Sequence, residues 1–87
     1  MSHQYLTAHP ADLLVDDVWL QAGDEVHITQ PSERYHDPDI GRDMVRVHGR
    51  IVKGWGAGKR ERVWSFRTDQ NLHVRRALTA EQAQLLE

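Results

Sequence analysis

The stretch Met44–Lys53, MVRVHGRIVK, alternates between two kinds of side chain with a period of two. Its odd positions hold Val45, Val47, Gly49 and Ile51, whereas its even positions hold Arg46, His48 and Arg50. Because successive side chains of a strand point to opposite faces, this pattern predicts a strand with one core face and one basic face.

The residues that follow predict two more strands. Gly54–Gly58 contains three glycines and a tryptophan, a composition typical of a chain reversal. Residues 60–68 then form the expected return strand, with Arg60 and Arg62 across the hairpin from the first strand, in a register that the sequence leaves open. A turn at 69–71 leads to 72–76, where Leu72 and Val74 alternate with polar residues. We therefore expect residues 44–76 to form a three-stranded antiparallel meander.

The residues before Met44 give a mixed pattern. Val26 and Ile28 share one face of residues 25–29, which indicates a half-buried strand. Residues 31–43 contain two prolines, a glycine and four acids, so we expect a long exposed loop. Residues 10–23 favour a short helix, with Pro10 in its first turn, although the β-branched and aromatic residues within it make a strand the alternative for part of the segment.

These elements predict a mainly β fold with a minor α component. We expect a small antiparallel sheet or a partly open SH3-like barrel of about four to five strands, with short N- and C-terminal helices. Thr79 and Gln82 form a capping box at the start of the C-terminal helix. Residues 1–9 are expected to be a flexible N-terminus, and residues 10–87 a single small β-rich domain.

Composition excludes several classes of site. The 87 residues include no cysteine, so disulfides, thiolate zinc sites and cysteine nucleophiles are excluded, and we expect a cytoplasmic location. No apolar run approaches the ~20 residues that span a bilayer, and no signal peptide is evident, so we expect no membrane partner. The chain also contains no nucleophile elbow, phosphate loop or paired-carboxylate motif, and we expect no enzymatic activity.

A cluster of one histidine and three acids in residues 36–43 offers candidate metal ligands. His36, Asp37, Asp39 and Asp43 supply imidazole and carboxylate groups, which are ligands for divalent metals. Their spacing matches no metal-binding motif, and Asp and Pro are common in loops for turn formation alone. We therefore expect no metal and no cofactor.

The net charge of −2 conceals a strong polarity along the chain. Residues 1–41 contain eight acids and one arginine, residues 42–76 contain ten cations and three acids, and residues 77–87 contain two acids. The three parts thus carry charges of −7, +7 and −2. Such asymmetry points to a polyanionic partner, unless the acidic and basic parts fold against each other or pair head to tail between protomers.

The sequence therefore leads to two functional hypotheses for a small, non-enzymatic binding module. In the first, the basic face of residues 42–76 binds DNA or RNA, with the cations contacting phosphates and the glycine-flanked Trp55 contacting a base or a groove. Trp64 and Phe66 are expected to fill the core, with base stacking as the alternative. The expected contact residues are Arg46, His48, Arg50, Trp55, Lys59, Arg60, Arg62, Arg75 and Arg76. In the second, the acidic N-terminal third and exposed Trp55 bind a protein partner or a second copy of the chain.

Overall fold

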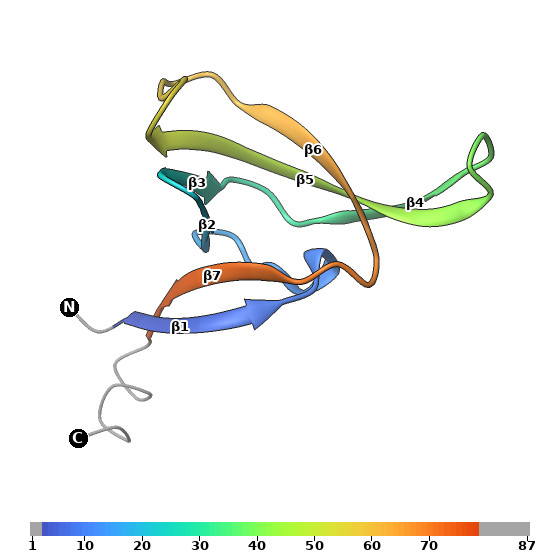
Figure 1. Cartoon of the computed structure of the whole chain (residues 1–87), viewed down its shortest axis with the longest axis horizontal. Coiled ribbons are helices and arrows are strands. Elements are labelled where there is room, and N and C mark those ends of the chain that lie inside the picture. Colours follow the sequence, from blue (N-terminus) through green and yellow to red (C-terminus); the bar gives the residue numbers. More distant parts are fainter. Residues whose placement is uncertain (1–2, 79–87) are drawn as a thin grey trace.

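The computed structural model describes residues 3–78 as one strongly curled antiparallel sheet, a β half-barrel (Figure 1). Its elements, in chain order, are β1 (His3–Ala8), the 3₁₀ turn η1 (Pro10–Asp12), β2 (Val18–Gln21), β3 (Asp24–Ile28), β4 (Glu33–Asp37), β5 (Arg42–Lys53), β6 (Arg62–Arg67) and β7 (Leu72–Ala77). In this part of the chain no helix is long and apolar enough to cross a membrane.

The long strand β5 organises the sheet. The strand order is β1-β7-β2-β3-β5-β4, and β6 pairs with the other side of β5. Two strands share one side of β5, because β3 pairs with its second half and β4 with its first. In Figure 1, β5 and β6 form one layer and β1 and β7 the facing layer, while β2 and β3 connect the two. The curl brings both layers around one core.

The core follows from the strand register. One row of side chains crosses five strands through paired positions, and all of its members are buried or half-buried apolar residues: Leu6, Val74, Trp19, Val26 and Ile51. The Trp19 ring packs edge-on against Trp64 and Phe66 of the opposite layer, at centroid distances of 5.5 and 5.0 Å. Since edge-to-face aromatic pairs are favourable, Trp19 links the two layers.

Several expectations from the sequence are confirmed. The fold is mainly β, antiparallel and curled. Along β5 the odd positions Val45, Val47, Gly49 and Ile51 are buried, as the period-two pattern predicted. The hairpin of β5 and β6 and the strand β3 are also present.

The expected N-terminal helix is wrong. Residues 10–12 form a single 3₁₀ turn, and Val18–Gln21 form β2, which pairs with both β3 and β7. The side chains of Val18 and Trp19 favour extended structure, and pairing on both sides of β2 outweighs the weak helical pattern. The C-terminal helix expected from Thr79 lies outside the described residues.

The strand count and one pairing also differ from expectation. Residues 3–78 form seven strands rather than the expected four to five. Residues 31–43 contain β4, which pairs with β5, rather than forming a loop throughout. Residues 1–9 were expected to stand free of the domain, but His3–Ala8 form β1 and pair with β7 along its length. The meander over residues 44–76 is incomplete, because β7 pairs with β1 and β2 rather than with β6.

Candidate nucleic-acid interface

The outward-facing cations of β5 meet an acid from the N-terminal third. The guanidinium group of Arg46 lies 3.8 Å from the Glu33 carboxylate and 4.2 Å from the centre of the Tyr35 ring. The Nε2 atom of His48 is buried without a hydrogen-bond partner and lies 3.6 Å from Glu33 Oε1. Two of the expected contact residues therefore face the same carboxylate.

Arg75 is also paired within the chain. Its guanidinium group donates a 2.7 Å hydrogen bond to Glu25, and the ammonium group of Lys53 lies 3.5 Å from the same carboxylate. The hydrogen bond from Arg75 is the main cause that holds the pKa of Glu25 below its usual value of 4.5. Glu25 thus draws two cations onto the outer face of β3.

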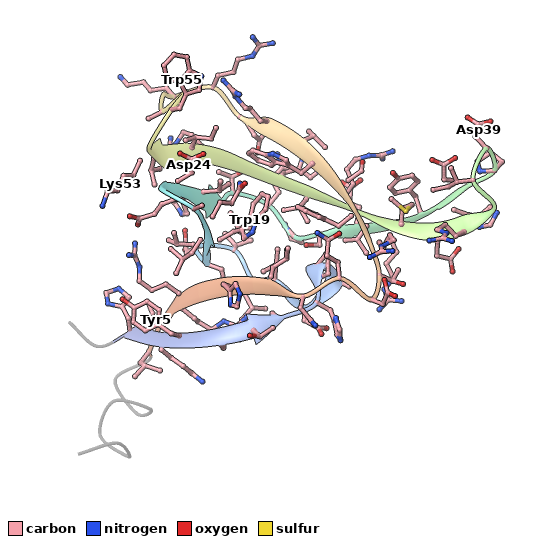
Figure 2. All side chains as sticks on the ribbon, in the orientation of Figure 1. Tyr5, Trp19, Asp24, Asp39, Lys53 and Trp55 are labelled. Atoms are coloured by element: carbon pink, nitrogen blue, oxygen red, sulfur yellow. The ribbon has the colours of Figure 1, made fainter. Side chains whose placement is uncertain are left out.

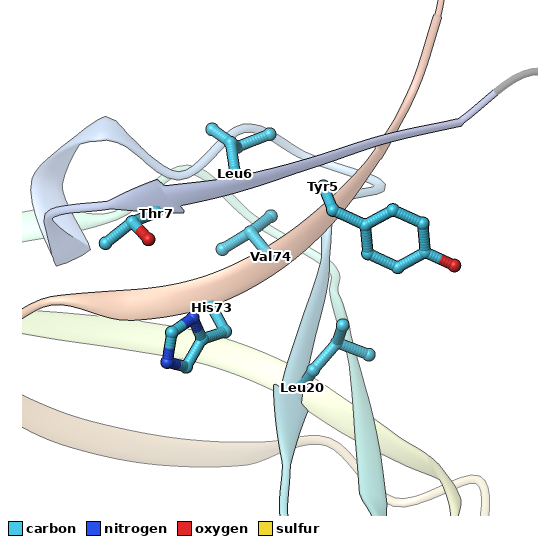
Figure 3. Close-up of a pocket in the computed structure, with 6 residues that line it drawn as sticks. All are labelled: Tyr5, Leu6, Thr7, Leu20, His73 and Val74. Atoms are coloured by element: carbon cyan, nitrogen blue, oxygen red, sulfur yellow. The ribbon is translucent and has the colours of Figure 1, made fainter.

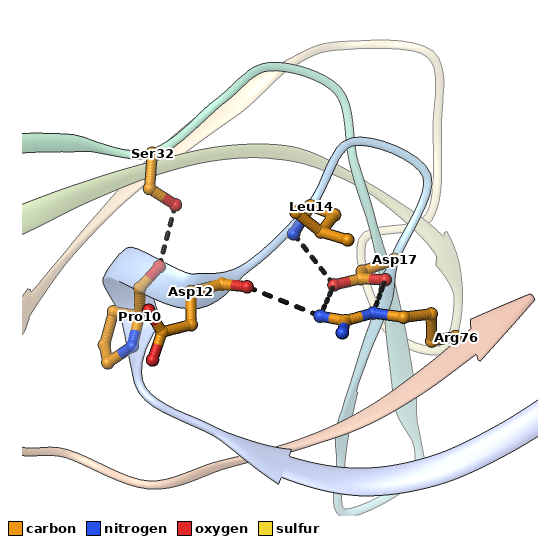
Figure 4. Close-up of polar contacts among 6 residues, drawn as sticks. All are labelled: Pro10, Asp12, Leu14, Asp17, Ser32 and Arg76. Atoms are coloured by element: carbon orange, nitrogen blue, oxygen red, sulfur yellow. Dashed lines mark hydrogen bonds and ion pairs between the residues drawn. The ribbon is translucent and has the colours of Figure 1, made fainter.

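Arg76 has a structural position. Its guanidinium group donates hydrogen bonds of 2.9 and 2.8 Å to the two carboxylate oxygens of Asp17, a residue that is only 2 % exposed (Figure 4). Asp17 also accepts a 2.9 Å bond from the Leu14 amide, and Arg76 reaches the Asp12 carbonyl at 3.3 Å. The hydrogen bond to Asp17 raises the pKa of Arg76. This network ties the segment before β2 to β7.

The register of the hairpin divides its cations between two faces. Arg62 is paired with Gly49, on the inward alternation of β5, whereas Arg46 and His48 point outward and face Ser65 and Val63. Arg62 is nevertheless exposed, because it lies where the sheet ends. The cations of the hairpin therefore do not share one face of the sheet as expected. Those that are free of acidic partners within the described residues gather at the end of the hairpin instead.

This basic end also contains an exposed tryptophan. Trp55 is 92 % exposed and projects from the tip of the β5–β6 hairpin (Figure 2). Lys59, Arg60 and Arg62 follow it in the chain and are also exposed. Among residues 3–78, no carboxylate lies within ion-pair distance of these three cations or of Arg50. The tip combines free cations with an accessible aromatic ring.

Two backbone amides of the tip donate hydrogen bonds to neighbouring strands. The Gly58 amide donates to the Ile51 carbonyl at 3.0 Å, and the Trp55 amide donates to Asp24 Oδ1 at 3.2 Å. Gly54 has a φ of 108°, which residues with a side chain rarely adopt. The tryptophan is therefore presented by an ordered turn.

Side-chain hydrogen bonds connect the residue before β6 to the residues that follow β3. The carboxylate of Glu61 accepts hydrogen bonds from the Thr29 hydroxyl and from the Gln30 amide, the latter at 2.9 and 3.1 Å. These contacts join the chain between Lys59 and Arg62 to the end of β3. Glu61, the acid within residues 54–62, is thus engaged by neutral partners, and the neighbouring Asp24 carboxylate accepts the Trp55 amide.

The other candidates from the sequence have structural roles. Trp64 is half-buried and Phe66 is 8 % exposed, so both fill the core as expected. His36 donates a 2.9 Å hydrogen bond to Asp43 across β4 and β5, and Asp37 accepts the Asp39 amide in the turn between them. Within residues 3–78 no three histidine or acidic side chains are grouped as metal ligands.

Tyr5 is a surface residue that the sequence reasoning missed. It lies on β1 and is 72 % exposed, although residues 1–9 were expected to be unanchored. A short sequence pattern could have predicted its position. Leu6 and Ala8 alternate with Tyr5 and Thr7, as in a half-buried strand that has Tyr5 on its exposed face.

Comparison with known proteins returned no match: no family model, curated protein or solved structure is significantly similar to this chain.

Proposed function

We propose that this domain binds single-stranded nucleic acid at the tip of the β5–β6 hairpin. The observation that supports the proposal is the 92 % exposed Trp55 in the same hairpin connection as the exposed Lys59, Arg60 and Arg62, which have no acidic partner within residues 3–78. The cations contact successive phosphates, and the indole stacks on an unpaired base. A positively charged track with an aromatic platform is the general arrangement of single-strand binders.

The chemistry of the tip favours affinity over sequence choice. Arginine forks bind phosphate oxygens in a bidentate manner, and every base offers a π face to a tryptophan. Phosphate contacts position a strand but carry no sequence information. We therefore expect a sequence-tolerant module that performs no chemical step. The SH3-like barrel predicted from the sequence is compatible with this role, since small β-barrels are frequent scaffolds for such sites.

Ion pairs within the chain favour this proposal over the hypothesis that the domain binds a protein partner. That hypothesis used the acidic N-terminal third as a contact surface. Four of the eight acids of that third, Asp16, Asp17, Glu25 and Glu33, are each paired with a cation or histidine of the same chain. Within residues 3–78 the cations of the hairpin tip have no such pairing, so they remain available to an anionic partner. Trp55 and arginine also suit a protein interface, which makes a protein partner or self-association the alternative.

The test is fluorescence anisotropy of a labelled twelve-nucleotide oligothymidylate titrated with the protein at low salt. The tip variant combines Lys59→Glu with Arg60→Glu. Its matched control combines Arg34→Glu with Arg42→Glu, which changes the net charge equally on exposed arginines of the β4–β5 hairpin. We expect the tip variant to lose about tenfold or more in affinity, since charge-assisted hydrogen bonds contribute about 1.5–3 kcal/mol each, and the control to lose far less.

Two results would contradict the proposal. If wild-type protein does not bind the oligonucleotide even at low salt, the function is not nucleic-acid binding, and protein partners become the subject of the search. If both charge-reversal variants lose affinity equally, the attraction comes from net charge rather than from the tip.

A further inference from the structure

A shallow groove lies beside Tyr5, away from the hairpin tip. It has a volume of about 320 Å³ and is lined by Tyr5, Leu6, Thr7, Leu20, His73 and Val74, contributed by β1, β2 and β7 (Figure 3). Tyr5 is 72 % exposed, and the pairing of β1 with β7 places Thr7 opposite His73. The groove thus combines an exposed aromatic ring with apolar walls, a hydroxyl group and an imidazole.

The strand register connects this groove to the hairpin. An outward-facing row crosses five neighbouring strands through paired residues: Tyr5, Arg75, Val18, His27 and Arg50. A second outward-facing row runs parallel to it through Thr7, His73, Leu20, Glu25 and Lys53. Neighbouring strands lie about 4.8 Å apart, so the first row covers roughly 19 Å from Tyr5 to Arg50. Figure 2 shows Tyr5, Lys53 and Trp55 along the same end of the molecule.

The charges along the two rows favour an anionic ligand. Arg50 has no acidic partner within residues 3–78, and Arg75 and Lys53 share a single carboxylate, that of Glu25. Asp16, which lies outside the rows, accepts a 2.8 Å hydrogen bond from His27. The rows themselves therefore hold three permanent cations, Arg50, Arg75 and Lys53, and one acid, Glu25, which is already engaged.

We propose that the groove beside Tyr5 is a second base-binding site for the same single strand, which extends from Trp55 across the outer rows to Tyr5. This inference rests on the proposed function of the hairpin tip. A base stacks on the phenol ring, the Thr7 hydroxyl and the His73 imidazole supply hydrogen-bonding groups at its edge, and Arg50 contacts the phosphates between the two platforms. Stacking on a solvent-exposed aromatic ring is tolerant of base identity.

The two-platform arrangement predicts a dependence on oligonucleotide length. A three-nucleotide strand held at Trp55 is too short to cross the roughly 19 Å of the outer rows and reach Tyr5. A twelve-nucleotide strand is long enough, and site sizes of about 4–16 nucleotides are usual for small β-barrel binders. Tyr5 should therefore contribute to the affinity of the long strand alone.

The experiment measures anisotropy of labelled three- and twelve-nucleotide oligothymidylates with wild-type protein, Tyr5→Ala, Tyr5→Phe and Trp55→Ala. Ile40→Ala, an exposed apolar residue in the turn after β4, is the control. We expect Tyr5→Ala to weaken binding of the long strand about fivefold or more and to leave the short strand unchanged. Tyr5→Phe should restore the affinity, and Trp55→Ala should weaken both lengths.

The outcomes separate this inference from the proposed function. If Trp55→Ala weakens binding of the long strand but Tyr5→Ala does not, the groove is not a base site, although the hairpin tip is. If neither oligonucleotide binds wild-type protein, both proposals fail. If Tyr5→Ala does not fold, photocrosslinking of a bromodeoxyuridine twelve-mer to the wild-type chain replaces it, with adducts expected at both Tyr5 and Trp55. An adduct at Trp55 without one at Tyr5 would contradict the groove.

Discussion

The ion pair between Asp17 and Arg76 joins the segment before β2 to the final described strand. Asp17 is 2 % exposed, so removing Arg76 leaves a buried carboxylate that has, among the described residues, no opposite charge and only the hydrogen bond from the Leu14 amide. Loss of one partner from such a pair typically costs about 3–5 kcal/mol. We expect Arg76→Ala to lower the free energy of unfolding by an amount in this range, measured by urea denaturation.

The matched control for Arg76 is Arg67→Ala. Arg67 lies 3.7 Å from the Asp69 carboxylate, and both side chains are more than half exposed. Surface pairs of this kind contribute about 0–1 kcal/mol. Equal urea midpoints for the two variants would show that the Asp17 carboxylate is not buried in solution.

Glu25 predicts a dependence of stability on acid pH. Its hydrogen bond from Arg75 lowers its pKa below the ordinary 4.5, so the folded state binds the proton less tightly than the unfolded state. The stabilisation is therefore complete above pH 4.5 and is lost as the pH falls through the pKa of the folded state. We expect Glu25→Gln to reduce the unfolding midpoint at neutral pH and to match wild type at about pH 2, well below the ordinary carboxyl range.

The measurement for Glu25 is a series of thermal melts between neutral and acid pH. Asp39→Asn, an exposed carboxyl-to-amide change in the turn after β4, is the control. A difference between wild type and Glu25→Gln that stays constant over the whole pH range would contradict the assignment.

Side-chain environments could be predicted from the sequence where they depend on local pattern. The alternation of residues 44–53 correctly placed Val45 and Val47 in the core, and the glycines beside Trp55 correctly indicated exposure. The partners of arginines could not be predicted in this way. Arg76 and Asp17 are 59 positions apart, and only the folded sheet brings them together.

Strands β3 and β5 approach each other closely at Gly49. We therefore expect a methyl group added at this position to destabilise the fold. A Cβ at this position would lie 2.8 Å from Val26 Cγ1 and 2.9 Å from the His27 carbonyl oxygen. Overpacking of this kind typically costs about 1–3 kcal/mol. We expect Gly49→Ala to lower the free energy of unfolding by that amount, whereas Gly58→Ala, with nothing within 4 Å, should have little effect. Equal urea midpoints for the two variants would contradict this packing.

The elements that the sequence missed are those whose stability comes from pairing. β1 has only two inward apolar residues, Leu6 and Ala8, and its register with β7 stabilises it. β4 follows a proline-containing stretch and is recognisable only through its ladder with β5. The hairpin of β5 and β6 was predicted because its turn is local, whereas β7 passes to the other layer, a choice that no local pattern encodes.

Across the whole chain, the opposite charges of its two parts are only partly neutralised. Five ion pairs join acids of residues 16–33 to cations or histidines of residues 46–76: Glu33 with Arg46 and His48, Glu25 with Lys53 and Arg75, and Asp17 with Arg76. The sequence predicted this asymmetry but left open whether the two parts meet. The fold brings them together along the sheet and leaves the hairpin end cationic.

This division predicts that salt affects binding and stability differently. If Lys59, Arg60, Arg62 and Arg50 contact phosphates of a single strand, the logarithm of the binding constant should fall with the logarithm of salt concentration with a slope of about −2 to −3. Charge removal by Lys59→Gln should make that slope shallower by about 0.7. The intrachain pairs are partly buried and screened less, so the unfolding midpoint should change little over the same range. Anisotropy and thermal melts in matched buffers measure both quantities. Affinity that is insensitive to salt would assign the contact to the indole of Trp55 and favour a protein partner over a nucleic acid.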